Sequence, residues 1–439
     1  MASDHARKRS SDIARGCLGN LVEWYDWFVY AWFGLYFAGA FFPSHDPTAQ
    51  LLATAVVFAI GFLMRPLGGW LLGLYADRFG RRPALTLSVS LMAAGSLAIA
   101  VNPGYSVIGV GAPVLLIVAR MVQGLSVGGE YGTSASYLNE VAHSRRRVFC
   151  ASFQYVSIVL GQLLALLTLI VMQHTMSEAS LTAWGWRIPF ALGAVLGLTV
   201  FYLRRHMGES EAHLRHQRES RAGRRQGMST LLREHRGQLA VAVALSTGGS
   251  VAWYTYTTYL PKYFVTSGGL DRNDMAVVGF AALVVLMLLQ PLAGLLADRF
   301  GRRVLLIVSA VGTIAVTVPI FTLARHTTNL VAVFALMVLG LFFLAGFLGA
   351  PAELFPTHLR ALGLGVGHSI ATAAFGGTVE TVALELKELG LGGLFPWYVV
   401  VMAAVMLAAA LLLPRVTTSS LDEAPEEQET SPRELETAA

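Results

Sequence analysis

Two arginines fall inside long apolar stretches of the sequence, where a charge needs water or a partner. Arg65 lies about ten residues before a polar loop, hence about 15 Å deep in a helix that crosses a membrane. Placing an arginine there costs about 2.5 to 3.5 kcal/mol, so it should face a wet cavity or an anion. Because a guanidinium binds a carboxylate through two parallel hydrogen bonds, Arg65 is a candidate for binding a small carboxylate. The alternative is a structural ion pair with Asp26 or Glu23, and for Arg120 structural pairing and substrate contact both stay open.

Acidic side chains in the same stretches could carry protons. Glu23 and Asp26 lie one helical turn apart, so their carboxylates repel each other, and burial disfavours the charged forms. We therefore expect one of them to hold a proton. An anion that binds Arg65 would release the acid paired with it, and that acid could then take up a proton. Secondary proton candidates are Glu130, His368 and Glu380, although a lone membrane histidine is often only a structural donor.

Other polar side chains could complete a site for a carboxylate. Arg187 lies between Trp186 and Pro189 at the start of an apolar stretch, where it could capture an anion at the mouth of a pathway. Candidates for lining the pathway and for hydrogen bonding a keto oxygen or a second carboxylate are Tyr30, Gln154, Gln162, Tyr254 and Tyr256. Such residues also serve helix packing or interfacial belts, and that alternative stays open.

The composition shows which elements must position these residues. Of 439 residues, 55% are hydrophobic and only 13% charged, against about 25% charged in ordinary soluble domains, which excludes a soluble enzyme. Membrane-spanning helices need about 20 apolar residues each. The sequence contains twelve such stretches, at 15–40, 50–75, 83–102, 111–138, 148–172, 186–204, 238–264, 275–297, 303–324, 329–354, 361–386 and 394–414. We therefore predict an all-α integral membrane protein with twelve transmembrane helices.

The positive charges predict how these helices are oriented. If the N-terminus is cytosolic, 25 of the 32 Lys and Arg residues fall on the cytosolic side, as short positively charged loops do. Both termini are then cytosolic, and a cell inner membrane is the expected location. The predicted organisation is a cytosolic N-terminal tail at 1–14, a six-helix bundle at 15–204, a basic cytosolic linker at 205–236, a second six-helix bundle at 237–414 and an acidic, disordered tail at 415–439.

One loop motif occurs twice. GLYADRFGRR at 73–82 follows the second apolar stretch, and GLLADRFGRR at 294–303 follows the eighth. In each half a glutamate then precedes an arginine by seven residues after the fourth stretch. An acid at a helix end beside several fixed cations suits an ion-pair network between helices, which could lock one conformation. The gating candidates are Asp77, Arg81, Glu140, Arg147, Asp298, Arg302, Glu353 and Arg360, whose charges could alternatively serve only to set the topology.

The doubled motif resembles the G-x-x-x-D-R-x-G-R-R signature of the major facilitator superfamily. Within it, the runs GNLVEWYD at 19–26, RMVQGLSVGGEYGT at 120–133 and WGWRIPF at 184–190 resemble the metabolite:proton symporter family. Trp27 and Trp32 depart from the pattern of that family. The resemblance implies two pseudo-symmetric six-helix bundles that rock about a central site near the membrane midplane.

The resemblance also implies a function. The runs ASFQYV at 151–156 and GQLLAL at 161–166, and the segment YTYTTY at 254–259, are most similar to members that carry 2-oxoglutarate (alpha-ketoglutarate). We therefore expect a proton-coupled symporter that imports a small carboxylate by alternating access, with citrate or another dicarboxylate, shikimate, or a proline/betaine-type osmolyte as the alternative substrate. We expect no enzymatic activity, no cofactor, no metal and no nucleic-acid partner, and a functional monomer in the lipid bilayer. A channel would lack concentrative uptake, and a nutrient sensor would bind without transport.

Overall fold

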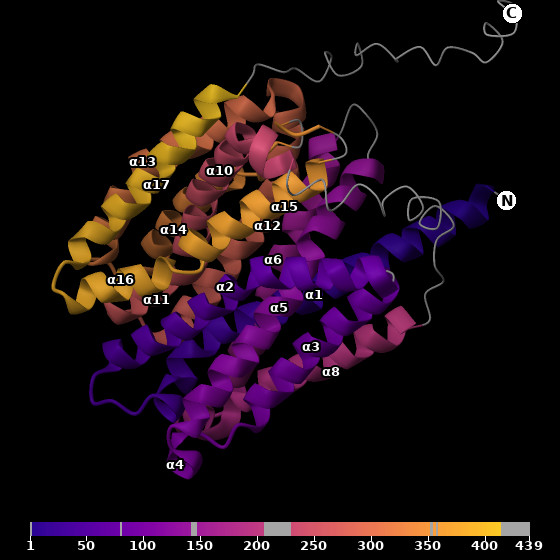
Figure 1. Cartoon of the computed structure of the whole chain (residues 1–439). Coiled ribbons are helices and arrows are strands. Elements are labelled where there is room, and N and C mark those ends of the chain that lie inside the picture. Colours follow the sequence, from indigo (N-terminus) through magenta and orange to yellow (C-terminus); the bar gives the residue numbers. More distant parts are fainter. Residues whose placement is uncertain are drawn as a thin grey trace, which may run out of the picture.

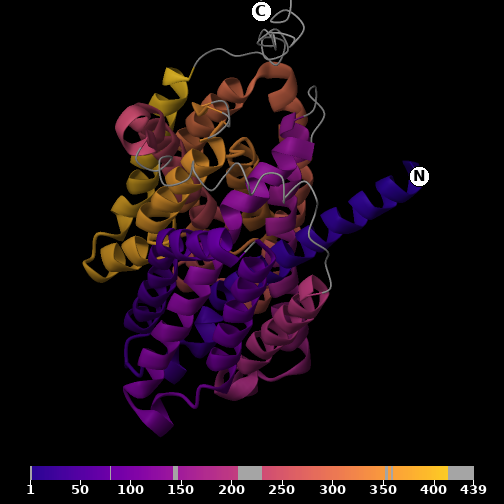
Figure 2. The same cartoon turned by 45° about the vertical axis from the view of Figure 1, so that its right-hand side comes forward.

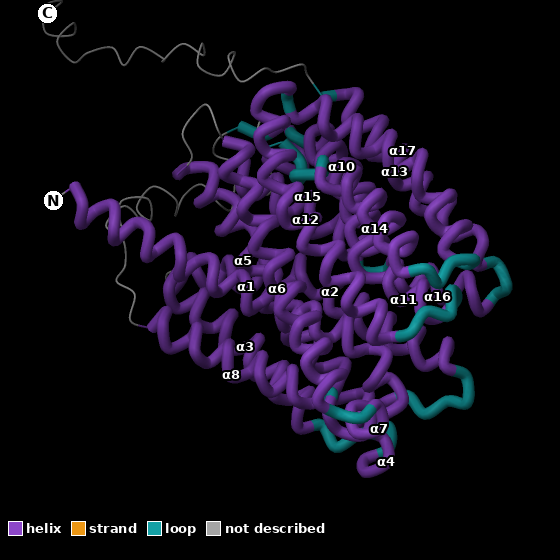
Figure 3. The backbone as a smooth tube through the Cα atoms, turned by 180° about the vertical axis from the view of Figure 1, so that it is seen from behind, coloured by secondary structure: helices purple, strands orange, loops and turns teal. Residues whose placement is uncertain are grey.

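The computed structural model describes residues 2–79, 81–141, 147–205, 230–351, 354–356 and 359–413. Within these ranges, the side chains of 2–18, 129–141, 203–205, Arg147 and a few positions near the repeated loops are not described. The described backbone is helical apart from short loops, and these loops gather at the ends of the helices (Figure 3).

Six long helices make up the first half of the chain (Figure 1). They are α1 (Ala2–Phe41), α2 (Pro47–Phe79), α3 (Arg81–Val101), α5 (Gly111–Val141), α6 (Arg147–Thr175) and α8 (Arg187–Arg205). Short turns of helix lie between them, namely α4 (Tyr105–Ile108), α7 (Glu178–Ser180) and the π-helical turn η2 (Leu181–Gly185). The N-terminal part of α1 projects beyond the other helices (Figure 2).

The second half repeats this arrangement, with two of its helices interrupted by π-helical turns. The first interrupted helix consists of α10 (Arg236–Tyr254), η3 (Thr255–Tyr259) and α11 (Leu260–Thr266), and the second of α15 (Arg360–Ala371), η5 (Thr372–Gly376) and α16 (Val379–Glu388). The others are α12 (Arg272–Phe300), α13 (Arg302–Ala324), α14 (Leu330–Ala345) and α17 (Phe395–Leu412), which the 3₁₀ turn η6 (Gly392–Leu394) precedes. Single π-helical turns are frequent at functional sites.

Each of the twelve predicted apolar stretches falls on one of these helices or interrupted helices. Among the described residues, six helices are long and apolar enough to cross a membrane on length and composition alone, and the pair Glu178–Gly185 and Arg187–Tyr202, bent by 51°, makes a seventh. The tenth stretch is shorter than predicted, because α14 ends at Ala345 instead of continuing to residue 354. Gly349 there adopts a φ of +76°, and Pro351 follows, so the chain leaves the helical conformation.

Glycines allow α2 and α5 to touch backbone to backbone. A Cβ atom added at Gly124 would lie 2.0 Å from the carbonyl oxygen of Gly61, and one at Gly128 would lie 1.9 Å from that of Arg65. Close packing of this kind is the usual way in which membrane helices associate. It places Arg65 directly against the middle of α5, inside the first half.

The two halves contact each other along α6 and α12, α2 and α16, and α5 and α15. We call the end of the molecule at which α2 passes into α3 and α12 into α13 the motif face, and the opposite end the far face. At the motif face, the carboxylate of Asp298 on α12 accepts hydrogen bonds from the backbone N–H groups of Val148 and Phe149, both at 3.0 Å. These two groups open α6, so Asp298 caps a helix of the other half and complements the positive end of its dipole.

The far face is also closed by contacts between the halves. Arg272 at the start of α12 binds Glu178 of the first half, with 2.9 Å between Nη1 and Oε1. Glu388, the last residue of α16, lies beside Asp46 of the loop between α1 and α2. Partial removal from water, followed by the neighbouring Asp46 carboxyl, raises the pKa of Glu388 above its ordinary value. Contacts at both faces therefore enclose whatever lies between the halves.

Candidate substrate site

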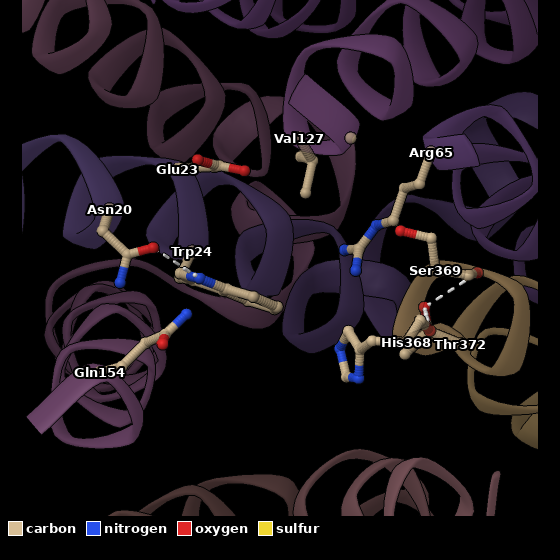
Figure 4. Close-up of a pocket in the computed structure, with 10 residues that line it drawn as sticks. Asn20, Glu23, Trp24, Arg65, Val127, Gln154, His368, Ser369 and Thr372 are labelled. Carbon is tan, nitrogen blue, oxygen red and sulfur yellow. Dashed lines mark hydrogen bonds between the residues drawn. The ribbon is translucent and has the colours of Figure 1, made fainter. Parts of the chain in front are cut away.

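A small cavity lies between the two halves (Figure 4). Its volume of about 20 Å³ is enough for one water molecule, so the structure shows a closed conformation of the site. Side chains from α1, α2, α5, α6, α15 and η5 line it, namely Asn20, Glu23, Trp24, Arg65, Val127, Gly128, Gln154, His368, Ser369 and Thr372.

Arg65 is the cation of this cavity. Its side chain is 5% exposed, and its guanidinium carbon lies 4.2 Å from the ring centre of Trp27 and 4.1 Å from that of Phe62. Such cation–π contacts stabilise a guanidinium by about 0.5 to 2 kcal/mol each. Pro66 follows Arg65 within α2 and cannot donate a backbone hydrogen bond, which loosens the helix at this point. Aromatic faces and a hydrogen bond with the Tyr254 hydroxyl therefore hold the guanidinium at the cavity.

Polar side chains of both halves surround Arg65. Glu23 on α1 is 7% exposed, and His368 extends into the same space from α15 (Figure 4). Asn20 accepts a hydrogen bond of 3.0 Å from the indole N–H of Trp24 and donates one of 2.6 Å to Ser157. The cavity thus combines one cation, one carboxylate, one imidazole and neutral hydrogen-bonding groups.

Arg120 lies on the other side of Trp27. Its guanidinium carbon is 4.2 Å from the Trp27 ring centre and 4.3 Å from that of Tyr30, and the side chain is fully buried. Nη1 of Arg120 donates a 2.8 Å hydrogen bond to Gln123, whereas Nε and Nη2 have no hydrogen-bond partner. One indole therefore separates two guanidinium groups, and the deeper group keeps unused donors.

Asp26 points into the first half and away from the cavity. Its carboxylate accepts hydrogen bonds from the Ser96 hydroxyl and from the Gln123 amide, the latter at 2.5 Å. Because Gln123 also accepts from Arg120, Asp26 is linked to Arg120 through one amide. The two acids of the predicted pair are thus separated, with Glu23 in the Arg65 cavity and Asp26 in the Arg120 network.

Five aromatic side chains separate the cavity from the far face, and we call them the aromatic layer: Trp27, Tyr30, Phe58, Phe62 and Tyr254. Ring centres lie 4.7 Å apart between Trp27 and Phe62, 5.0 Å between Phe58 and Phe62, and 5.0 Å between Phe62 and Tyr254. Tyr30 stacks on Phe58 at 5.8 Å. Since Tyr254 belongs to the second half and the others to the first, relative motion of the halves would open this layer.

The remaining substrate candidates lie at other places. Tyr256 donates or accepts a 2.6 Å hydrogen bond with Thr317 inside the second half. Gln162 donates 2.9 Å to the Thr257 carbonyl, which ties α6 to η3. Arg187 lies at the far face, where Nη2 donates 3.0 Å to the Asn102 carbonyl.

Of the gating candidates, Asp298 makes the contact between the halves described above, and Arg302 and Arg360 begin α13 and α15. The side chains of Asp77, Arg81, Glu140, Arg147 and Glu353, and that of the proton candidate Glu130, lie outside the described residues.

Two functional candidates escaped the sequence analysis. Lys262 was not among the candidates, but it lies in α11 and pairs with Glu380 at 2.6 Å. Its position inside the predicted stretch 238–264, two residues before its end, could have indicated a charge within the membrane. Trp27 shares a helical face with Glu23 in the sequence, which indicated a position beside the site, but it was not named as a site residue.

Comparisons with known proteins agree with this architecture. The chain is 46% identical to the alpha-ketoglutarate permease of Escherichia coli K12 over 419 residues, which covers 94% of this chain and 96% of the permease. It is 33% identical to a citrate-proton symporter of Salmonella typhi, with 91% and 93% of the two chains covered. It is 32% identical to the glycine betaine/proline/ectoine/pipecolic acid transporter OusA of Dickeya dadantii, with 95% and 85% covered.

Among solved structures, a D-xylose-proton symporter matches with a TM-score of 0.71 at 21% identity, covering 92% of this chain and 97% of the symporter. The inward open conformation of the xylose transporter XylE from E. coli matches with a TM-score of 0.68 at 21% identity, covering 97% and 99%. At this identity the match concerns the fold, which is the predicted twelve-helix major facilitator fold.

The sequence description of the sugar (and other) transporter family matches residues 15–231 and 220–427, one match for each half. With its all-helical fold, its paired halves and these matches, the chain belongs to the sugar (and other) transporter family, and it is a membrane transporter rather than an enzyme.

Proposed function

We propose that this protein is a proton-coupled symporter that imports 2-oxoglutarate by alternating access. In this proposal it acts as a monomer in the cell inner membrane, with both termini and the motif face in the cytosol, and it needs no cofactor besides the proton gradient. The similarity to alpha-ketoglutarate permease over nearly the whole chain supports the substrate, and the similarity to a citrate-proton symporter supports a carboxylate coupled to protons.

The observation that carries the proposal is the pair of guanidinium groups on the two faces of Trp27, each 4.2 Å from its ring centre. A dicarboxylate has one carboxylate for each guanidinium, and each pair can form two parallel charged hydrogen bonds. Displacement of the indole would let both arginines bind one small molecule. A zwitterionic osmolyte supplies only one carboxylate and brings a positive charge to a site that already has two.

Proton coupling follows from the exchange of partners at Arg65. While the site is empty, Glu23 is the carboxylate that shares the cavity with Arg65. When a substrate carboxylate binds the guanidinium, Glu23 loses the charge that favoured its ionised form and takes up a proton. Asp26 stays the second proton candidate, because its hydrogen bonds with Ser96 and Gln123 connect it to Arg120. His368 stays a further proton candidate, because it lines the same cavity.

Alternating access requires that the two faces open in turn. At the motif face, Asp298 must leave the N-terminus of α6, and toward the far face the aromatic layer must part between Tyr254 and Phe62. Both contacts join the two halves. Rocking of the halves about the Arg65 cavity would therefore break the contact at one face while the contact toward the other face is made.

The proposal is tested by uptake of radiolabelled 2-oxoglutarate into proteoliposomes that contain the purified protein, with an inward proton gradient imposed. We expect accumulation above the external concentration, its loss on addition of a protonophore, and competition by unlabelled dicarboxylates but not by betaine. No uptake by protein that is monodisperse and melts cooperatively, or uptake of betaine in place of 2-oxoglutarate, would refute the substrate.

A further inference from the structure

A second buried charge pair lies beyond the aromatic layer, on its far side. Nζ of Lys262 on α11 donates to both carboxylate oxygens of Glu380 on α16, at 2.6 and 2.8 Å. The two side chains are 8% and 7% exposed. A Cβ atom added at Gly34 of α1 would lie 3.5 Å from Nζ and 3.7 Å from the methyl carbon of Thr54 on α2. The pair therefore belongs to the second half but packs against the first, at the boundary that moves in the proposed cycle.

Stability alone does not explain this pair. Each charge within the membrane costs about 2.5 to 3.5 kcal/mol, and replacing a buried ion pair by apolar side chains of similar volume is often neutral or stabilising. Gly34 leaves space beside the ammonium that any side chain would reduce. A pair that is costly, buried at the boundary between the halves, and placed against a glycine fits a group that must change partners.

The surroundings of Lys262 on the far side suit an anion. Lys262 also lines a second cavity of about 20 Å³, between α1, α6, α11 and α12, together with Arg272, Trp32 and Gln173. The indole N–H of Trp32 is buried there without a hydrogen-bond partner. Arg272 reaches the surface, with 38% of its side chain exposed. Two cations and an unused N–H donor thus mark a path from the far face to Lys262.

The pair also connects to the arginines of the first half. The phenol of Tyr30 lies within electrostatic range of both Glu380 and Arg120, and its ring centre is 4.3 Å from the Arg120 guanidinium carbon. A carboxylate that leaves Lys262 would therefore meet Arg120 after passing one ring of the aromatic layer.

We propose that Lys262 is the first buried cation to bind the substrate carboxylate from the far face, and that this binding releases Glu380 to take up the co-transported proton, which Glu23 receives later, when the substrate reaches Arg65. The inference rests on the proposed function and extends it to the far-side half of the cycle. Before binding, the site holds one ammonium and one carboxylate; afterwards it holds the ammonium, the substrate carboxylate and a neutral carboxylic acid. The proton thus offsets the charge of the carboxylate that binds Lys262, whereas the second carboxylate of the dicarboxylate keeps its negative charge.

Glu380 is the carboxyl group of the Lys262 pair and the candidate for the proton in this region. The titratable groups that the structure brings near it are Lys262 on α11, Tyr30 on α1 and Tyr259 on η3, and Arg325 acts on Tyr259 from the end of α13. Phenols ionise only near pH 10 and a guanidinium stays charged, so neither supplies or accepts the proton.

The test compares two transport assays on a Glu380→Gln variant. Counterflow exchanges labelled for unlabelled substrate without net proton movement, whereas accumulation requires proton coupling. The amide cannot exchange a proton and binds Lys262 more weakly than a carboxylate does. We therefore expect counterflow to stay within about threefold of wild type while accumulation driven by the proton gradient is lost. Unchanged accumulation, or loss of both activities in a folded variant, would overturn the proposal.

Two further variants guard against misfolding and against a purely structural role. The double variant Lys262→Met/Glu380→Leu keeps the packing volume without the charges, so it should fold; we expect its KM for uptake from the far face to rise at least tenfold. Lys387→Met, on the same α16 helix, is the matched control and should leave KM unchanged. Wild-type KM in the double variant would assign the pair a structural role. If the wild-type protein neither exchanges nor accumulates 2-oxoglutarate, the proposed function itself fails.

Discussion

Removal of the Arg65 guanidinium should weaken substrate binding without unfolding the protein. In Arg65→Gln, the substrate carboxylate loses two charged hydrogen bonds, and loss of one charged partner costs about 1.5 to 3 kcal/mol. This corresponds to about a 10- to 150-fold rise in KM, at about 1.4 kcal/mol for each factor of ten. The fold should tolerate the change. The variant loses cation–π contacts with Trp27 and Phe62 that stabilise the protein by about 0.5 to 2 kcal/mol each. It also no longer buries a charge in the membrane, which saves about 2.5 to 3.5 kcal/mol and offsets that loss.

Initial rates of 2-oxoglutarate uptake over a range of concentrations give KM, and the thermal midpoint of the purified variants gives stability. Arg65→Lys keeps the charge but not the planar fork, so its KM should fall between those of wild type and Arg65→Gln. Arg236→Gln, at the exposed start of α10, is the matched control. A KM within twofold of wild type in folded Arg65→Gln would refute the assignment of Arg65 as a substrate ligand.

Three further outcomes follow from the packing and the faces. Asp298→Ala removes the cap on α6, which stabilises the contact between the halves by about 1 kcal/mol. The motif face should then open more often, so maleimide should label Cys150, on the first turn of α6, several-fold faster. An unchanged labelling rate would argue against Asp298 as a lock. Gly128→Ala forces α2 and α5 apart and should lower the thermal midpoint by several degrees, whereas Gly237→Ala, which meets nothing within 4 Å, should not; equal midpoints would contradict the backbone contact. The pKa of Glu388 is raised in the folded protein, so folding favours its protonated form and the protein loses stability as the pH rises through that pKa. The wild-type thermal midpoint should therefore be higher at pH 5 than at pH 7, and Glu388→Gln should reduce this difference. An unaltered pH profile in the variant would contradict the contact with Asp46.

The helices could be predicted from the sequence because the membrane imposes a simple rule, about 20 apolar residues for each crossing. The rule fails where the backbone departs from a continuous helix. It placed the tenth stretch through residue 354, although α14 ends at Ala345 and the positive φ of Gly349 and the following Pro351 keep the next residues out of a helix. It also gave no sign of the π-helical turns at Thr255–Tyr259 and Thr372–Gly376, because an extra residue in a turn leaves the hydropathy unchanged.

The sequence could single out the two arginines that lie in apolar stretches, but it could only partly predict the direction in which each charged side chain points. A charge well inside an apolar stretch needs a polar environment, which singled out Arg65 and Arg120. Glu23 and Asp26 are three residues apart, about 60° from each other around a helix, and that small angle is enough to place them in different networks. Only the packing of α1 against its neighbours decides which acid faces the cavity.

Residues near the predicted ends of helices were the least predictable. Lys262 sits near the boundary of its stretch, where hydropathy cannot distinguish a loop lysine from one directed inward to Glu380. That distinction depends on the pairing of α11 with α16, far apart in the sequence. The alternative that Tyr256 and Gln162 serve packing was left open, and their contacts with Thr317 and with the Thr257 carbonyl favour it in this conformation.

The most direct test of the central claim measures protons and substrate together. Proteoliposomes that contain the protein and an internal pH-sensitive dye are held at equal pH inside and outside, and 2-oxoglutarate is then added outside. A symporter of an acidic substrate predicts acidification of the lumen that saturates with 2-oxoglutarate, is absent with betaine, and is absent in vesicles without protein. Uptake of labelled 2-oxoglutarate without any acidification, or acidification with betaine but not with 2-oxoglutarate, would contradict it.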